Sequence, residues 1–193
     1  MQSIINAIEA GSLNAQIVQV IASRYDIPAA QRAARFQLPY QVVPRKEYGS
    51  DISAMSRAIL QILEPLAIDL ILLCGFLSFL GEELLEAFPE QIMNIHPSLL
   101  PAFGGKGAYG IRVHQAVLEH GVKLSGCTVF FVDKGEDTGQ IILQKGVAVL
   151  EDDTPETLRL RVMAAEEEAY PEAVSLFAQR RLTVEGRRVR ILS

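Results

Sequence analysis

The chain has 193 residues and a formal net charge of −5, with 49% hydrophobic and 21% charged residues. This composition is typical of a globular protein of ordinary domain size and excludes the disordered class, so we expect a single domain over residues 1–193. The acidic balance argues against a nucleic-acid partner, because phosphate binding requires clustered Lys and Arg. The one basic cluster, at residues 186–192, is interpreted as a solvated tail.

Short apolar runs alternate along the chain with segments of helical composition. Strands are predicted over residues 15–23, 40–44, 68–75, 91–96, 125–132 and 139–150. Helices are predicted over residues 2–10, 27–36, 50–64, 81–88 and 111–121, with a last long helix that begins near residue 154. This alternation predicts an α/β fold with an open, mostly parallel, twisted sheet and helices on both faces.

The last helix has the clearest start signals. Thr154 can cap it, and Pro155 suits the first helical position. A buried stripe is predicted from apolar residues at helical spacing, namely Leu158, Val162, Ala165 and Ala169. Glu166 and Glu168 flank this stripe, so either carboxylate could reach a cleft, although an acidic run is also typical of a solvated helix face.

The two cysteines, Cys74 and Cys127, lie in apolar stretches and show neither metal-binding nor redox spacing. They are interpreted as small buried hydrophobic residues in a reducing compartment, and no metal site is predicted. No stretch approaches the ~18–20 uninterrupted apolar residues of a membrane span, and no signal peptide is recognised. We therefore expect a cytoplasmic protein without a membrane partner.

An asparagine and a histidine stand two residues apart at the end of the strand predicted over 91–96. Asn94 and His96 project to the same face if the strand continues through both, and Pro97 holds His96 on an extended backbone. Ligands of open parallel sheets bind beyond the carboxyl ends of the strands, where this pair lies. A single histidine is more often structural than catalytic, but the pair followed by a Pro-rich loop indicates a site.

A third polar group could orient the imidazole, and the loop over residues 132–141 offers three candidates. Asp133, Glu136 and Asp137 are all available, and spacing does not choose among them, while turn chemistry alone could also explain these residues. No serine or cysteine is placed as a nucleophile. The pattern favours acyl transfer, in which the Asn94 amide and a His96 imidazolium stabilise an oxyanion, and a nearby carboxylate raises the pKa of His96.

Four segments together resemble a known enzyme family. They are "NIHPSLLPAFGGKG" (94–107), "GVKLSGCTVFFVDKGEDTGQIILQ" (121–144), "DTPETLRLRV" (153–162) and "EEEAYPEAV" (166–174). The chain is similar, in order from residue 2 to residue 185, to the phosphoribosylglycinamide formyltransferases. The resemblance implies transfer of a formyl group from the co-substrate 10-formyltetrahydrofolate to the amine of glycinamide ribonucleotide in purine biosynthesis. The alternatives are another formyltransferase or a formyltetrahydrofolate hydrolase on the same scaffold, or a catalytically impaired folate-binding protein.

The resemblance also implies roles for individual residues. The catalytic residues are Asn94, His96 and Asp137, which chooses among the three carboxylates. Glu166 is expected to hold the substrate ribose, with Pro97 and Gly75 at the border of the reacting centre. The folate-binding residues are expected to be Leu77, Phe79, Leu80, Leu85, Asp133 and Gly135. Without the resemblance the apolar members of this set would be interpreted as core. The partners are small-molecule substrates, and a homodimer is allowed.

Members of this family open with a strand and a glycine-rich loop of the type "SGxGSN", whereas the first residues here match the helix that follows this loop. We therefore predict that segments 15–21 and 69–74 are neighbours across a narrowed or vacant slot in the sheet. Three explanations are open: an incomplete N-terminus in the recorded sequence, direct closure of the gap, or a partner chain that fills it. Phe130, where many members carry a histidine, and Ser78 are further departures.

Overall fold

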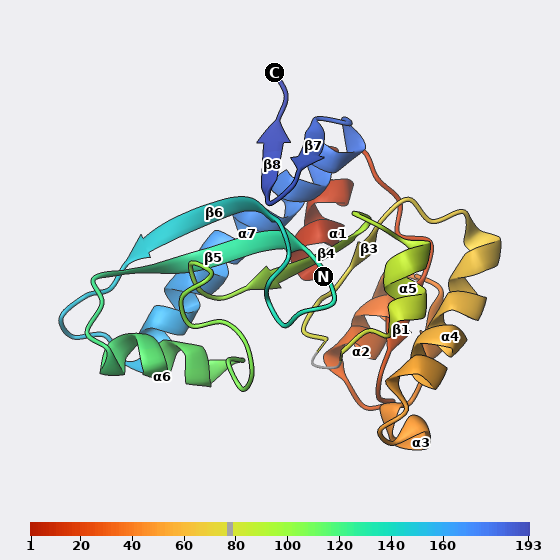
Figure 1. Ribbon diagram of the computed structural model, residues 1–193, viewed down its shortest axis with the longest axis horizontal. Coiled ribbons are helices and arrows are strands. Elements are labelled where there is room, and N and C mark those ends of the chain that lie inside the picture. The colour runs from red at the N-terminus through yellow and green to blue at the C-terminus, as the bar shows by residue number, and fades with distance from the viewer. Residues whose placement is uncertain (77–78) are drawn as a thin grey trace.

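The computed structural model describes residues 1–76 and 79–193, in which helices and strands alternate through most of the chain (Figure 1). The helices are α1 (Gln2–Glu9), α2 (Pro28–Arg35), α3 (Arg45–Tyr48), α4 (Ile52–Leu63), the 3-10 helix η1 (Glu64–Leu66), α5 (Glu82–Ala87), α6 (Ile111–Glu119) and α7 (Pro155–Ala178). The strands are β1 (Val20–Ala22), β2 (Tyr40–Val42), β3 (Ile71–Leu72), β4 (Ile92–His96), β5 (Leu124–Phe131), β6 (Ile141–Ala148), β7 (Leu182–Glu185) and β8 (Arg188–Ile191).

The main sheet has the strand order β3-β4-β5-β6, and β1 pairs with β2 in a separate ribbon. The pairings β1–β2 and β3–β4 are parallel, whereas β4–β5 and β5–β6 are antiparallel. The predicted class, an open α/β sheet, is confirmed, and its parallel part is the N-terminal one. A direct hairpin joins β5 to β6 without a crossover helix, so this pair is antiparallel.

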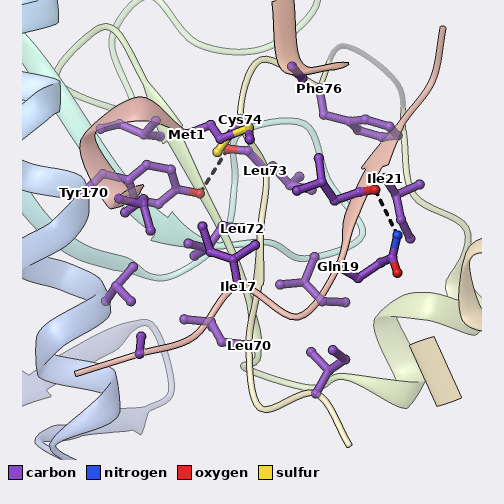
Figure 2. Close-up of a pocket in the computed structure, with 18 of the residues that line it drawn as sticks. Met1, Ile17, Gln19, Ile21, Leu70, Leu72, Leu73, Cys74, Phe76 and Tyr170 are labelled. Carbon is purple, nitrogen blue, oxygen red and sulfur yellow. Dashed lines mark hydrogen bonds between the residues drawn. The ribbon is translucent and has the colours of Figure 1, made fainter. Parts of the chain in front are cut away.

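The strands β1 and β3 do not pair with each other, and a cavity of about 1260 Å³ separates them (Figure 2). Residues 14–24 line one side of this cavity and residues 67–76 line the other. The predicted vacant slot between segments 15–21 and 69–74 is therefore confirmed. Each of these strands has a hydrogen-bonding partner on one edge, and each is shorter than the sequence predicted.

Two apolar clusters occupy opposite faces of the main sheet. One contains Met93, Val129 and Phe131 and packs against α1 and α7, and the other contains Ile92 and packs against α4 and α5. Successive residues of β4, Ile92 and Met93, thus enter different clusters, as expected for a strand covered on both faces. Within the residues described, no helix combines the length and the apolarity needed to cross a membrane.

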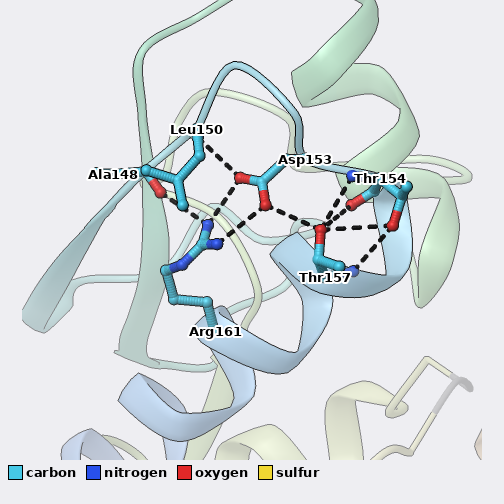
Figure 3. Close-up of polar contacts among 6 residues, drawn as sticks. All are labelled: Ala148, Leu150, Asp153, Thr154, Thr157 and Arg161. Atoms are coloured by element: carbon cyan, nitrogen blue, oxygen red, sulfur yellow. Dashed lines mark hydrogen bonds and ion pairs between the residues drawn. The ribbon is translucent and has the colours of Figure 1, made fainter.

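The start of α7 follows the predicted signals. The Thr154 side chain accepts a hydrogen bond from Thr157 N–H at 3.2 Å, and Pro155 takes the first helical position. Asp153 adds a second device at this end: its carboxylate accepts two hydrogen bonds from Arg161, at 2.7 and 2.9 Å (Figure 3). The predicted stripe is largely confirmed, with Leu158, Val162 and Ala169 at most 1% exposed.

The C-terminal residues form a hairpin in which β7 pairs with β8 in antiparallel register. The turn between them contains Gly186 at φ +62°, a backbone conformation that glycine adopts without strain. The interpretation of residues 186–192 as a solvated tail was wrong for their backbone. It holds for their exposure, because Arg188, Arg190 and Ile191 remain exposed.

Candidate functional site

The strand β4 presents Asn94 and His96 on one face, as the sequence predicted. In the antiparallel pairing with β5, Asn94 lies opposite Phe130 and His96 opposite Thr128. His96 is buried at 4% exposure, whereas Asn94 and the following Pro97 are half-buried. Among the described residues no hydrogen bond engages the side-chain amide of Asn94, which leaves its N–H groups available to a substrate oxygen.

The imidazole of His96 faces an oxygen atom on each of its two nitrogens. Nδ1 lies 3.4 Å from Oδ2 of Asp137, and Nε2 lies 2.9 Å from the carbonyl oxygen of Phe103. Oδ2 of Asp137 also accepts a hydrogen bond from Gly105 N–H at 2.9 Å. Both oxygens are hydrogen-bond acceptors, so they hold the ring in one orientation. The structure therefore brings together His96 and Asp137, and Glu136 and Asp133 make no such contact with this ring.

A buried hydrogen-bond network that the sequence analysis missed fixes the loop after His96. Thr128 Oγ1 donates to the Ser98 carbonyl at 2.7 Å and accepts from Leu100 N–H at 3.0 Å. Gln144 Nε2 donates to both Thr128 Oγ1 and the Leu100 carbonyl. The network ties the loop to β5 and β6 and so positions Phe103 and Gly105. A threonine within the apolar run 127–132 was the signal that could have revealed it.

Glu166 and Gly75 both line the cavity between β1 and β3. Met1 also lines this cavity, whereas Asn94, His96 and Asp137 do not. Burial raises the pKa of the Glu166 carboxyl to about 7, against the opposing effect of the Met1 ammonium. Gly75 has φ +69°, which favours glycine. Glu168, the other flanking carboxylate, is exposed and forms an ion pair with Lys145 at 3.1 Å.

The residues expected to bind folate lie on α5, on the segment before it, and on the loop after β5. Leu80 and Leu85 are half-buried and pack in one cluster with Val132, while Phe79 is 50% exposed and Leu77 lies outside the described residues. Lys134 joins the loop to α5 through an ion pair with Glu82 at 3.0 Å. These contacts join α5 and the segment before it to the start of the loop after β5.

The carboxylate of Asp133 is engaged within its own loop. Its Oδ1 accepts hydrogen bonds from Gly135 N–H at 2.9 Å and from the Thr138 hydroxyl at 2.7 Å. A Cβ at Gly135 would come within 1.9 Å of Thr138 Oγ1, so the tight loop requires glycine there. Phe130 is 2% exposed beside Asn94, and Ser78 lies outside the described residues.

Comparison with known proteins agrees with this fold. Residues 1–174 match the formyl transferase family, and the chain belongs to that family. One relative is the chloroplastic phosphoribosylglycinamide formyltransferase of Arabidopsis thaliana. It is 40% identical to this chain over 172 residues, which are 89% of this chain and 59% of that protein. The phosphoribosylglycinamide formyltransferase of Haemophilus influenzae is 35% identical over 94% of this chain and 83% of its own length.

A solved structure is similar over the whole chain. The crystal structure of glycinamide ribonucleotide transformylase 1 from Symbiobacterium toebii has a TM-score of 0.92 and 43% identity, and covers 100% of this chain and 88% of its own. The chain spans 59% of the length of the Arabidopsis protein and 58% of that of the chloroplastic phosphoribosylglycinamide formyltransferase of Vigna unguiculata. It spans 17% of the trifunctional purine biosynthetic protein of Gallus gallus.

Proposed function

We propose that this protein transfers the formyl group of 10-formyltetrahydrofolate to the amine of glycinamide ribonucleotide in de novo purine biosynthesis. The observation that carries the proposal is the trio at the edge of the sheet: the unengaged amide of Asn94, and His96 held between Asp137 and the Phe103 carbonyl. The relatives named above, which carry the same activity in their names, support it.

The reaction begins when the substrate amine attacks the formyl carbon, whose carbonyl oxygen becomes an oxyanion. Asn94 donates an N–H to this oxygen, and the charged imidazole of His96 stabilises it. The bond from the formyl carbon to the folate nitrogen then breaks, and the amine proton moves to that nitrogen as the leaving group. Asp137, directly or through a water molecule, keeps His96 charged and helps to relay the proton.

The contact between His96 Nε2 and the Phe103 carbonyl affects this mechanism. At 2.9 Å the Phe103 carbonyl accepts the hydrogen bond from His96 Nε2. The same N–H cannot then be donated to an oxyanion. In the reaction, either the loop that carries Phe103 moves so that Nε2 can donate to the oxyanion, or Asn94 alone donates a hydrogen bond to it. Catalytic hydrogen bonds often form fully only when substrate is bound.

The remaining roles are those that the resemblance to the family implies. Glu166 is proposed to hold the substrate ribose, and Pro97 and Gly75 are proposed to border the reacting centre. The folate ring is proposed to lie on Leu77, Phe79, Leu80 and Leu85, with Asp133 and Gly135 contributing backbone groups. A cytoplasmic location and a homodimer stay predictions, which fractionation and light scattering would test.

A steady-state assay with 10-formyltetrahydrofolate tests the proposal, run with and without glycinamide ribonucleotide. We expect folate turnover only when the ribonucleotide is present, and formylated ribonucleotide in equal amount. Release of formate without the ribonucleotide would indicate a hydrolase instead. Folate binding without any turnover would indicate a binding protein.

A further inference from the structure

The hydroxyl of Tyr170 lies where three segments of the chain meet. Tyr170 belongs to α7 and is 3% exposed. Its Oη donates toward two carbonyl oxygens, that of Leu73 just after β3 at 3.0 Å and that of Met93 in β4 at 2.9 Å. Figure 2 shows the hydroxyl directed at the end of β3. One side chain therefore links α7 to two neighbouring strands.

The contact lies where β3 and β4 separate. Their parallel pairing ends with Leu72 opposite Met93, and the Leu73 N–H adds one more bond to the Met93 carbonyl at 2.9 Å. Beyond this point β4 continues to His96 in pairing with β5. Cys74 is exposed, and not buried as the sequence predicted, because the chain leaves the sheet here. The hydroxyl supplies a donor to a carbonyl at the end of the ladder.

Both carbonyls precede residues of the proposed site. Met93 comes directly before Asn94, whose amide is proposed to donate to the oxyanion, and Leu73 comes two residues before Gly75. A carbonyl oxygen lies in one rigid plane with the N–H and the Cα of the next residue. A hydrogen bond that holds the Met93 carbonyl therefore also fixes the Cα from which the Asn94 side chain extends.

The hydroxyl, and not the ring, is suited to this task. Burial raises the pKa of the Tyr170 hydroxyl well above its ordinary value of 10, so it keeps its proton at neutral pH. A phenol carries a single proton, which the two acceptors share, so both carbonyls are held around one donor. The ring packs in the cluster that contains Met93, and a phenylalanine would fill the same space. Only the hydroxyl can fix the two carbonyls.

We propose that Tyr170 is a positioning residue for the Asn94 amide, which its hydroxyl holds in place through the peptide plane of Met93. Tyr170 does not touch the substrate, and it acts by fixing the direction in which Asn94 donates. Its effect on catalysis rests on the proposed function, because that function gives the amide an oxyanion to stabilise. A contact of this kind is made in the transition state, so its loss lowers kcat more than it changes KM.

The test replaces Tyr170 by Phe, which keeps the ring and removes the hydroxyl. We expect kcat of formyl transfer to fall by about tenfold or more, because a small misplacement of a catalytic group is costly. KM for either substrate should change by less than about twofold. The control is Leu176→Ala, at a buried position of the same helix that is 8% exposed. It should lower the midpoint of thermal unfolding and keep kcat. A similar loss of kcat in the control, or a change confined to KM, would overturn the proposal.

A double-mutant cycle with Asn94→Ala separates positioning from general weakening of the fold. In the Asn94→Ala background there is no amide to position, so Tyr170→Phe should lower kcat by less than about twofold. A loss of the same factor in both backgrounds would mean that the hydroxyl acts independently of Asn94, and the proposal would fail.

A measurement without substrate tests the geometry by itself. In NMR spectra of the ¹⁵N-labelled protein, the side-chain amide signals of Asn94 should shift in Tyr170→Phe, whereas those of Asn6, exposed on α1, should not. Unchanged Asn94 signals would overturn the proposal whatever the activity. If the parent chain transfers no formyl group and the Asn94 signals shift, the proposed function fails and the positioning stands.

One observation needs no variant and decides the case if Tyr170→Phe does not fold. In the parent chain the hydroxyl proton of Tyr170 should give a slowly exchanging NMR signal, assigned through its contacts with the ring protons. A hydroxyl proton that exchanges freely with water would overturn the proposal, because the two carbonyls would then not hold it.

Discussion

His96 and Asp137 come from different elements, yet Nδ1 of His96 lies 3.4 Å from Oδ2 of Asp137. One residue ends β4, and the other lies in the turn between β5 and β6. Asp137 adopts φ +56°, an unusual backbone conformation for a residue other than glycine. Such conformations are found where the surroundings hold a functional side chain in place. The contact thus joins the end of β4 to the loop of the β5–β6 hairpin.

The first prediction concerns this contact. Replacement of Asp137 by Asn keeps an oxygen for Gly105 N–H but removes the negative charge beside His96. We expect the kcat of formyl transfer to fall by at least about 100-fold, the lower range for a positioned acid or base. The midpoint of thermal unfolding should change little. Stopped assays of formylated product and a melting curve measure the two quantities.

The control for Asp137→Asn is Glu136→Gln, in the same loop. Glu136 makes no contact with His96, so this variant should keep nearly full kcat. A comparable loss in both variants would mean that the charge of the whole loop, rather than the contact of one carboxylate, supports catalysis.

The second prediction concerns the network below the catalytic loop. Thr128→Val keeps the shape of the side chain but leaves the Leu100 N–H and the Ser98 carbonyl without their partner. Unpaired buried polar groups of this kind should lower the free energy of unfolding by roughly 2–3 kcal/mol. Because the loop also holds Phe103 and Gly105, kcat should fall as well.

Denaturant titration measures the stability of Thr128→Val, and Thr183→Val on the exposed face of β7 serves as its control. The control should change stability by no more than about 0.5 kcal/mol. If Thr128→Val is equally mild, then water replaces the lost hydroxyl and the network is not what fixes the loop.

The elements that the sequence predicted well are those whose signals are local. The cap and buried stripe of α7, and the run 125–132 that became β5, are set by neighbouring residues in the chain. The lengths of β1 and β3 could not be predicted in this way. A strand is ordered by hydrogen bonds to other segments, and both strands have a partner on one edge.

The site shows the same division. Alternation along a strand was sufficient to place Asn94 and His96 on one face. The choice of Asp137 over Asp133 and Glu136 was open from spacing, because it depends on how the turn folds back toward β4. The hydrogen bonds of Thr128 could not be predicted from its type, since threonine is common in strands for reasons unrelated to function.

The third prediction concerns Glu166. Burial raises the pKa of this carboxyl from its ordinary value of 4.5 to about 7, while Met1 and Arg159 oppose the shift. The folded protein therefore favours the neutral carboxyl. The free energy of unfolding is highest below pH 4.5, where the carboxyl is neutral in both states, and this stability is lost as the pH rises through 7. Glu166→Gln, which stays neutral, should be more stable than the parent chain at pH 7.5, by no more than about 3 kcal/mol, and equally stable near pH 4.5.

Melting curves across this pH range test the Glu166 prediction, with the exposed neighbour variant Glu167→Gln as control. The control should follow the parent chain closely, because the charge of Glu167 is the smallest of the contributions to the raised pKa of Glu166. An advantage of Glu166→Gln that is constant with pH would contradict the assignment, since it would then arise from packing and not from titration. The same variant should also weaken binding of the ribonucleotide if Glu166 holds its ribose.

The fourth prediction concerns the start of α7, where Asp153 is 2% exposed and accepts hydrogen bonds from Arg161, Thr157 and Leu150 N–H (Figure 3). The Arg161 guanidinium, foremost among these groups, holds the pKa of the Asp153 carboxyl well below its usual range. A lowered pKa means that the stabilisation is complete above about pH 4 and is lost as the pH falls further. We expect Asp153→Asn to lower the free energy of unfolding by roughly 2–3 kcal/mol at pH 7.

The difference between the parent chain and Asp153→Asn should shrink as the pH falls from 4 to 2, because the parent then loses the same charge. Urea titrations at several pH values measure it. The matched control is Glu151→Gln, which removes an ion pair with Lys123 whose side chains are 87% and 71% exposed. An exposed ion pair contributes little to the free energy of unfolding. If both variants lose the same small amount, burial does not strengthen the Asp153–Arg161 pair, and the capping threonines alone hold the start of the helix that carries Glu166.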